Sequence, residues 1–231
     1  MPNTGAGRRG SYAKGVAKRE EILTRALEVI AREGYHGASV KELAAAVGLS
    51  QAGLLHYFDS KEELFTEILR KRDDLDMAAF GGVEAVSTDI DTVRDGYLKV
   101  IRHNSEVPGV VELFSRLSVE AADPRHPAHR FFLERNRALR AVFTDVIGQS
   151  QDAGQVTKAI DADTLARILQ AVADGLQVQW MLEPHIDMAA IVDALIRALS
   201  AGGPSGGLAG GFAASPSDGA SGGSSRGDGD E

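Results

Sequence analysis

The sequence predicts an all-α protein, with an N-terminal unit of short helices followed by a longer helical body. Apolar residues recur at the spacing of one helix face, whereas alternating β-branched residues are almost absent and aromatic residues make up only 6% of the chain. Capping signals also stand where this spacing breaks. The first apolar face comprises Ile22, Leu23, Ala26, Leu27, Ile30 and Ala31. It predicts a helix that ends at Gly34.

Three serines predict the starts of the next three helices. Residues 39–42 and 60–63 both read as capping boxes, in which a serine oxygen accepts the amide of a glutamate three residues later and the glutamate reaches back. Ser50 can cap the helix between them without a glutamate. We therefore expect a second helix after Ser39, a third after Ser50 and a fourth from Ser60.

Longer helices are expected in the rest of the chain. Two closely spaced prolines predict a loop over 123–127, because proline disrupts a helix interior. The glycine- and serine-rich composition of 201–231 predicts disorder, since such a tail buries too little apolar surface to offset its ordering entropy. The expected helices cover 89–104, 108–122, 128–151, 161 or 163 to 182, and 187–199.

Composition excludes several classes of site. The chain has no cysteine, which excludes disulfides and thiolate chemistry and fits a reducing cytoplasm. We expect neither a signal peptide nor a transmembrane helix, because no apolar run is long enough. His126 and His129 flank a loop proline without nearby ligands, so we expect no metal. No cofactor loop and no catalytic constellation are evident, and a non-enzymatic role is expected.

Charge is distributed unevenly along the chain. The net charge is −8, yet residues 1–72 carry twelve basic and nine acidic residues, a net charge of +3. Five of the basic residues precede the first acidic residue, Glu20. They are Arg8, Arg9, Lys14, Lys18 and Arg19. This asymmetry favours a flexible basic arm over 1–16 that meets phosphates, although a merely solvated basic tail would have the same composition.

Residues 39–58 have the pattern of a helix-turn-helix. Two short helices that pack closely need a small residue at the contact and a residue tolerant of positive φ at the turn, and Ala44 and Gly48 provide these. Leu49, Leu54 and Phe58 can anchor the second helix to the core. Its opposite face remains free to enter a major groove.

The residues of that free face suit two tasks. Gln51 can hydrogen-bond a base edge, and Ala52 can contact a thymine methyl. Several neighbours are suited to phosphate, with Lys61 acting beside the amides that begin the fourth helix. Gly53 would allow close approach to DNA. The complete set of candidate DNA-binding residues is Ser39, Lys41, Ser50, Gln51, Ala52, Gly53, His56, Tyr57 and Lys61.

The run from Lys18 to Leu64 resembles the DNA-binding domain of the TetR/AcrR family. The family's Gly-Tyr helix end, its Gly-Leu-Ser turn and its Ser-Lys-Glu-x-Leu segment occur here at 34–35, 48–50 and 60–64. One departure is Leu55-His56-Tyr57-Phe58, where the family often has Tyr-Tyr-His-Phe. The resemblance implies a helix-turn-helix DNA-binding domain over 17–64, and a ligand-binding and dimerisation domain over 65–200. It also implies a homodimer joined by the last two helices.

The resemblance further implies a cavity for a small-molecule effector in the helical body. Large apolar residues and a few polar ones are the expected lining, although each could equally be plain core. These candidates are Phe114, Leu117, Phe132, Phe143, Trp180 and Met181, with His103, Arg116 and Gln177 as polar groups.

The resulting hypothesis is a ligand-responsive repressor that binds a palindromic operator on double-stranded DNA and is released by an unidentified effector. The alternatives are an activator or a regulator controlled by a protein partner, which reporter output and a ligand screen would distinguish. A further alternative is an enzyme that uses the helical body. Turnover without DNA affinity would favour it.

Overall fold

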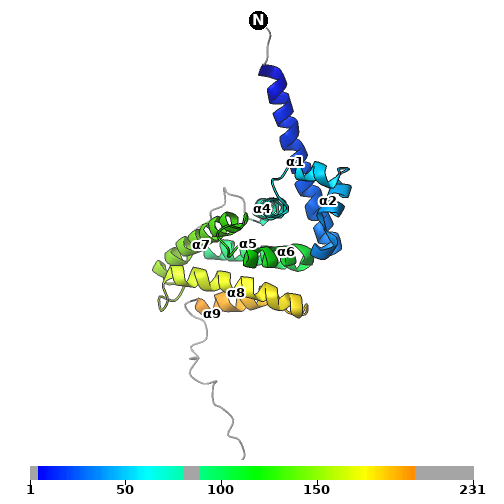
Figure 1. The fold of residues 1–231 in the computed structure, drawn as a ribbon. Coiled ribbons are helices and arrows are strands. Elements are labelled where there is room, and N and C mark those ends of the chain that lie inside the picture. The colour runs from blue at the N-terminus through cyan, green and yellow to red at the C-terminus, as the bar shows by residue number, and fades with distance from the viewer. Residues whose placement is uncertain (1–4, 81–88, 201–231) are drawn as a thin grey trace, which may run out of the picture.

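Nine α-helices account for most of the residues that the structure describes (Figure 1). The structure is a computed structural model that describes residues 5–80 and 89–200, with side chains for 13–79 and 89–200. The predicted disordered tail, 201–231, lies outside the described residues. In order, the helices are α1 (Gly5–Gly37), α2 (Val40–Ala46), α3 (Gln51–Leu55), α4 (Lys61–Phe80), α5 (Ile90–Glu106), α6 (Pro108–Glu120), α7 (His129–Asp152), α8 (Ala162–Leu182) and α9 (Met188–Leu199). The all-α prediction is confirmed.

The first helix departs from the prediction at both ends. A flexible arm was expected up to residue 16, but α1 is already helical from Gly5. Once the packed part of a helix exists, adding residues to its end avoids the unfavourable nucleation step, which explains the extension. At the other end Gly34 breaks the helical geometry as predicted, with φ 75° and ψ 169°, although the helix continues beyond it to Gly37.

The predicted capping signals begin the helices. Ser39 forms a complete capping box with Glu42, and the Ser50 side chain accepts from the Gly53 amide. The Ser60 hydroxyl accepts the Glu63 amide at 3.0 Å, but the Glu63 carboxylate accepts from the amide of Asp59 rather than from Ser60. Aspartates cap three of the later helices, at Asp89, Asp161 and Asp187.

One apolar core continues from the N-terminal helices into the body. Buried residues of α1 to α4 form a single cluster with residues of α6 and α7, including Val110, Phe114 and Phe131. The predicted domain boundary at residue 64 therefore falls inside α4 and across a continuous core. Because the core is shared, the position of the N-terminal helices is coupled mechanically to the body.

The contact between α1 and α6 is the closest helix crossing in this shared core. Gly109, in the first turn of α6, lies against the backbone of α1 near Ile30 and Gly34. A β-carbon at Gly109 would lie only 2.7 Å from the Gly34 Cα atom. Only glycine permits this approach.

The body is completed by α8 and α9, which form the layer farthest from α2 and α3 (Figure 1). A second cluster joins α5, α6, α8 and α9 around Leu98, Val111 and Trp180. A third lies where α7 meets α8, around Phe143 and Leu165. An isolated antiparallel bridge between Val156 and Ser200 ties the end of α9 to the loop after α7.

Candidate DNA-binding surface

The turn between α2 and α3 is fixed by the backbone. Gly48 has φ 69°, the left-handed conformation that the sequence predicted for this position. The Leu49 amide donates to the Ala44 carbonyl at 2.9 Å, which closes the turn. Ala44 is buried at the helix contact, so its small side chain allows α2 and α3 to approach as expected.

One side of α3 is anchored and the other is free. Leu54 and Phe58 are fully buried, and Leu49 packs partly against the same cluster. Gln51 and Ala52 are exposed on the opposite side, at the start of the helix. A helix that is anchored on one face and exposed on the other can present its N-terminal residues to a groove.

Two candidate residues lie just beyond α3, which ends at Leu55. His56 is its C-cap and is exposed, whereas Tyr57 is half-buried against the apolar cluster. Their rings meet edge to face at a centroid distance of 6.0 Å. Gly53 is half-buried, and its amide is already bound by Ser50 at 3.0 Å. His56 is therefore more accessible to DNA than Tyr57 is.

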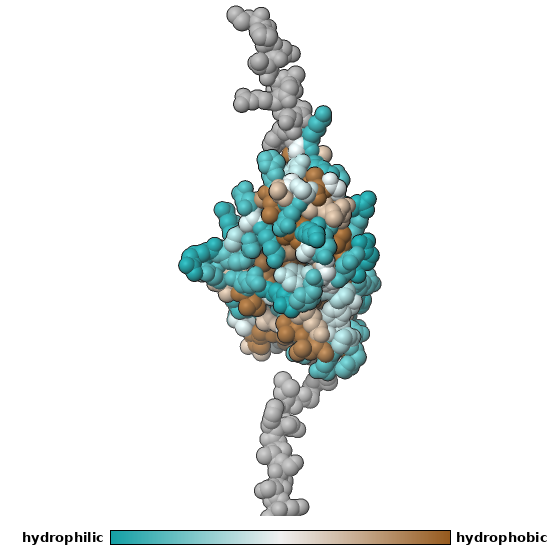
Figure 2. Space-filling model, turned by 45° about the vertical axis from the view of Figure 1, so that its right-hand side comes forward, coloured by the Kyte–Doolittle hydropathy of each residue, from teal (hydrophilic) through white to brown (hydrophobic). Residues whose placement is uncertain are grey.

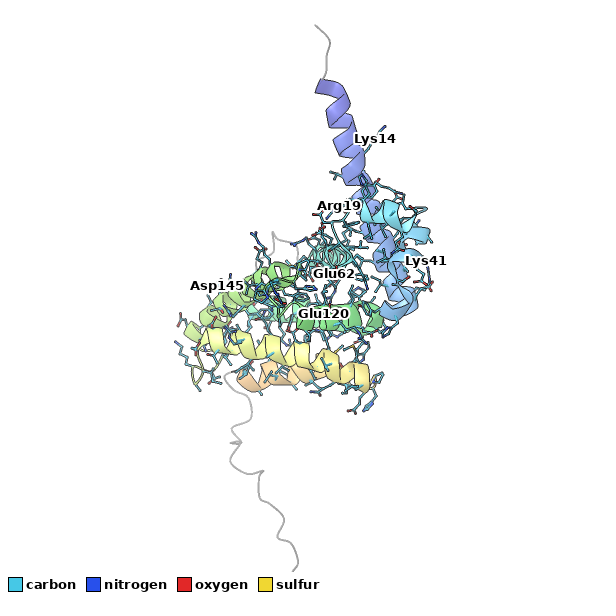
Figure 3. The ribbon with its side chains drawn as sticks, in the orientation of Figure 1. Lys14, Arg19, Lys41, Glu62, Glu120 and Asp145 are labelled. Atoms are coloured by element: carbon cyan, nitrogen blue, oxygen red, sulfur yellow. The ribbon has the colours of Figure 1, made fainter. Side chains whose placement is uncertain are left out.

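Three lysines surround this face. Lys14, Lys41 and Lys61 are all exposed, and none has an acidic partner within the described part of the chain. The Lys61 ammonium lies 5.4 Å from the centre of the Phe65 ring. Lys14 extends from the long α1, whereas Lys41 lies on the outer side of α2 (Figure 3). Ser39 is exposed too, but its hydroxyl and amide serve the capping box.

The basic segment before Glu20 is only partly available to DNA. Arg8 and Arg9 lie outside the residues whose side chains are described. Lys18 pairs with Glu21 at 2.9 Å. Arg19 donates to the Tyr57 carbonyl and to the Glu63 carboxylate at 3.0 Å, and its guanidinium lies 4.3 Å from the centre of the Phe58 ring. The sequence grouped Arg19 with the phosphate-binding residues, whereas the structure shows that it joins α1 to the end of α3 and the start of α4.

Arg19→Ala is expected to lower the free energy of unfolding by about 1–2 kcal/mol, because it removes hydrogen bonds to a carbonyl and a carboxylate that solvent partly screens. Urea denaturation measures the change. Arg25→Ala is the matched control: Arg25 is exposed and pairs with Glu28 on the same helix, so its removal should have an effect within about 0.5 kcal/mol. Equal losses for the two variants would contradict the structural role of Arg19.

The candidate ligand residues do not share one cavity. Phe114, Leu117 and Phe132 belong to the core shared with the N-terminal helices. Trp180 and Met181 belong to the second cluster, and Phe143 to the third. Hollows of about 170 Å³ between α5 and α9 and about 560 Å³ near the loop before α7 are lined by none of the nine candidates.

The polar candidates are also separated. Arg116 is exposed and bonds Glu112 at 2.8 Å and His36 at 3.2 Å, so it lies at the contact between α6 and α1. His103 lies 3.2 Å from Glu106 and 4.0 Å from Asp76. Gln177 is buried on α8. His126 and His129 bond the loop around them, since His126 accepts the Ala128 amide and His129 contacts the Ala121 carbonyl at 2.8 Å.

A buried charged group inside the body was missed by the sequence reasoning. Arg72 and Asp76 on α4 are only 6% and 7% exposed, and they form an ion pair of 3.1 Å. Arg72 also donates to Asn104 of α5. The signal was present in the sequence, because these residues continue the apolar stripe of α4 from Ile68 at the same helical spacing.

The fold and this surface define a helix-turn-helix DNA-binding protein. Residues 22–68 match the family described as bacterial regulatory proteins, tetR family, and residues 117–201 match the BetI-type transcriptional repressor C-terminal family. The HTH-type transcriptional repressor Rv1474c of Mycobacterium tuberculosis is 30% identical over 180 residues, covering 77% of this chain and 90% of that protein. The repressor AcnR of Corynebacterium diphtheriae is 28% identical over 68% of this chain and 78% of its own length. The chain belongs to the TetR family of transcriptional regulators.

Solved structures agree with this assignment. A transcriptional regulator from a Rhodococcus species aligns with a TM-score of 0.60 at 25% identity, over 78% of this chain and 95% of its own. A TetR regulator from Haloarcula marismortui aligns with a TM-score of 0.63 at 19% identity, over 78% of this chain and 94% of its own, which shows a shared fold. The family and these relatives are transcriptional regulators rather than enzymes. In the described ranges, no helix is long and apolar enough to cross a membrane.

Proposed function

We propose that this TetR-family repressor binds a palindromic operator as a homodimer and is released from it by a small-molecule effector. The observation that carries the proposal is the free face of α3, where Gln51 and Ala52 are exposed beside unpaired lysines on a helix whose other side is fixed in the core. Fixed orientation is needed for base readout, because a base-edge hydrogen bond depends on geometry.

Different residues of this surface serve different roles. Gln51 and Ala52 meet base edges, and Gly53 allows the backbone to come close. Phosphates meet the side chains on either side, which set the position on the duplex without reading sequence. The phosphate-contacting group comprises Ser39, Lys41, Ser50, His56, Tyr57 and Lys61.

Dimerisation through α8 and α9 is supported by the apolar surface that these helices leave exposed. Val178, Leu182 and Ile191 are large apolar residues at 49%, 79% and 43% exposure. Small residues lie between them, which would let helices approach closely. These are Ala171, Gly175, Ala190, Ala194 and Ala198. Figure 2 shows brown, apolar surface gathered at the lower end of the molecule, where α8 and α9 lie. Two copies joined here would present two recognition helices to major grooves about 34–36 Å apart.

Effector control is supported by the shared core. The N-terminal helices pack on α6 and α7, so a ligand that shifts the body also shifts α3. The effect of such a ligand is limited by its difference in affinity for the two conformations.

The test is a salt titration of binding to the DNA upstream of the protein's own gene, with a random duplex as the reference. We expect specific binding by two protomers per site that tightens steeply at low salt. In contrast, equal and weak binding to both duplexes, repeated with sites from a random-library selection, would contradict operator binding.

Two substitutions separate the roles of the surface residues. Gln51→Ala is expected to weaken operator binding by about 1–3 kcal/mol and to leave random DNA unaffected, because a base contact is lost. Lys61→Ala should weaken both, and lower the salt slope by about one for each protomer bound. Lys99→Ala, an exposed lysine of the body, is the control and should change neither. The same loss on both duplexes for Gln51→Ala and Lys61→Ala would contradict this division.

A further inference from the structure

A polar stripe on α8 faces α7. Gln170, Asp174 and Gln177 follow one another at helical spacing along this stripe. Its direction is fixed by Gln170, whose Nε2 donates to the Asn136 carbonyl of α7 at 3.1 Å. We use the term polar seam for Asp174 and Gln177 of this stripe together with Tyr97 of α5 and Arg135 of α7.

Asp174 is a carboxylate without a counter-ion in direct contact. It forms no hydrogen bond or ion pair with any residue that the structure describes. Burial raises the pKa of Asp174, although the charges of Arg135 and Arg72 lower it. Those two arginines are already engaged, since Arg135 pairs with Asp73 at 2.8 Å and Arg72 with Asp76 at 3.1 Å. Asp174 is therefore the excess carboxylate of this region.

Gln177 lies one turn further along α8 and has an unsatisfied acceptor. Its side chain is only 8% exposed, and its Oε1 atom is buried with no donor among the described residues. A buried carbonyl oxygen without a donor is unfavourable and is uncommon in folded proteins. A bound molecule with an N–H group would satisfy it.

Aromatic rings border the seam. Burial and the nearby charge of Asp174 raise the pKa of Tyr97, so the phenol and the carboxylate lie near each other. The Tyr97 ring packs on Phe143 at a centroid distance of 4.8 Å. Trp180 is buried one turn beyond Gln177. Such rings attract a cation as well as apolar groups.

We infer that the polar seam is the effector site and that it takes a protonated primary or secondary amine. The ammonium charge faces Asp174, one of its N–H groups donates to Gln177 Oε1, and its apolar part packs on Tyr97 and Trp180. An anion would be repelled by Asp174, and a quaternary ammonium has no N–H for Gln177. The inference rests on the proposed effector control. A ligand entering here displaces Gln170 from Asn136 and so moves α8 relative to α7.

The test measures binding without DNA, so that it does not depend on operator release. Trp180 is the only tryptophan of the chain, which makes its fluorescence a reporter one turn from Gln177. The probes are butylammonium, trimethylbutylammonium, 1-butanol and butyrate, each titrated into the full chain at constant ionic strength. We expect saturable binding of butylammonium, at least tenfold tighter than that of the other three.

Two variants with matched controls complete the test. Asp174→Asn should weaken butylammonium binding at least tenfold. Gln177→Ala should weaken it severalfold and reduce its advantage over trimethylbutylammonium. Asp145→Asn and Gln179→Ala, at exposed positions of α7 and α8, should leave both affinities unchanged, and circular dichroism checks that each variant is folded.

Two outcomes would overturn the inference: butyrate or butanol binding as tightly as butylammonium, or retention of amine binding by folded Asp174→Asn. Failure of the proposed function is seen separately. In that case the amine binds as described, but adding it to the operator complex leaves DNA affinity unchanged.

Discussion

Gly109→Ala is expected to lower the free energy of unfolding by about 2–3 kcal/mol, because a side chain is forced into a closely packed helix crossing. The added β-carbon would meet the Ile30 carbonyl oxygen and the Gly34 Cα atom, both of which belong to the backbone of α1. Backbone atoms cannot rotate away as a flexible side chain can. The collision therefore outweighs the gain of about 0.5–1 kcal/mol that alanine normally brings to a helix interior. Urea denaturation measures the net change.

The same variant tests the coupling between the body and the DNA-binding helices. Since α6 has to move away from α1, we expect operator affinity to fall together with stability. Gly148→Ala is the control, because its β-carbon would meet only Ala162 at an ordinary distance of 3.9 Å, and it should be neutral or stabilising. A Gly109→Ala protein as stable as Gly148→Ala would show that the crossing is looser than the structure has it.

The close crossing at Gly109 also shows where sequence reasoning stops. Helix starts could be predicted because each depends on a few adjacent residues: Ser39, Ser50 and Asp187 cap their helices through their own side chains. The turn at Gly48 is equally local. Gly109, in contrast, is required by the backbone of α1, which is distant in the sequence.

The candidate sites divide in the same way. The exposed face of α3 follows from helical periodicity alone, so Gln51, Ala52 and His56 could be placed from the sequence. The ligand candidates could not, because Phe114 and Trp180 are equally apolar and only packing assigns them to different clusters. Likewise, the basic character of Arg19 was visible, but its contacts with Tyr57 and Glu63 depend on how α1 lies against α3 and α4.

Arg72→Met is expected to have the largest effect of all, a loss of about 3–5 kcal/mol in the free energy of unfolding, because it leaves the Asp76 carboxylate buried without its counter-ion. It also removes the donor to Asn104. Arg72→Met/Asp76→Leu is the matched control. Removing both charges from an apolar stripe should recover most of the stability. If the double variant were as unstable as the single one, the loss would come from packing rather than from an unpaired charge.

The dependence on pH identifies the charge directly. Burial raises the pKa of Asp76 even in the intact protein, while Arg72 lowers it, so removal of Arg72 raises that pKa further. A carboxyl whose pKa is higher in the folded than in the unfolded chain destabilises the fold as pH rises above the unfolded value of about 3.9. The deficit of Arg72→Met relative to the intact protein is therefore expected to be full at pH 7.5 and smaller at pH 5, where more of Asp76 is protonated. Urea denaturation at the two pH values measures it, and the comparison cancels carboxylates common to both proteins. An equal deficit at both would rule out the ionised Asp76 as its cause.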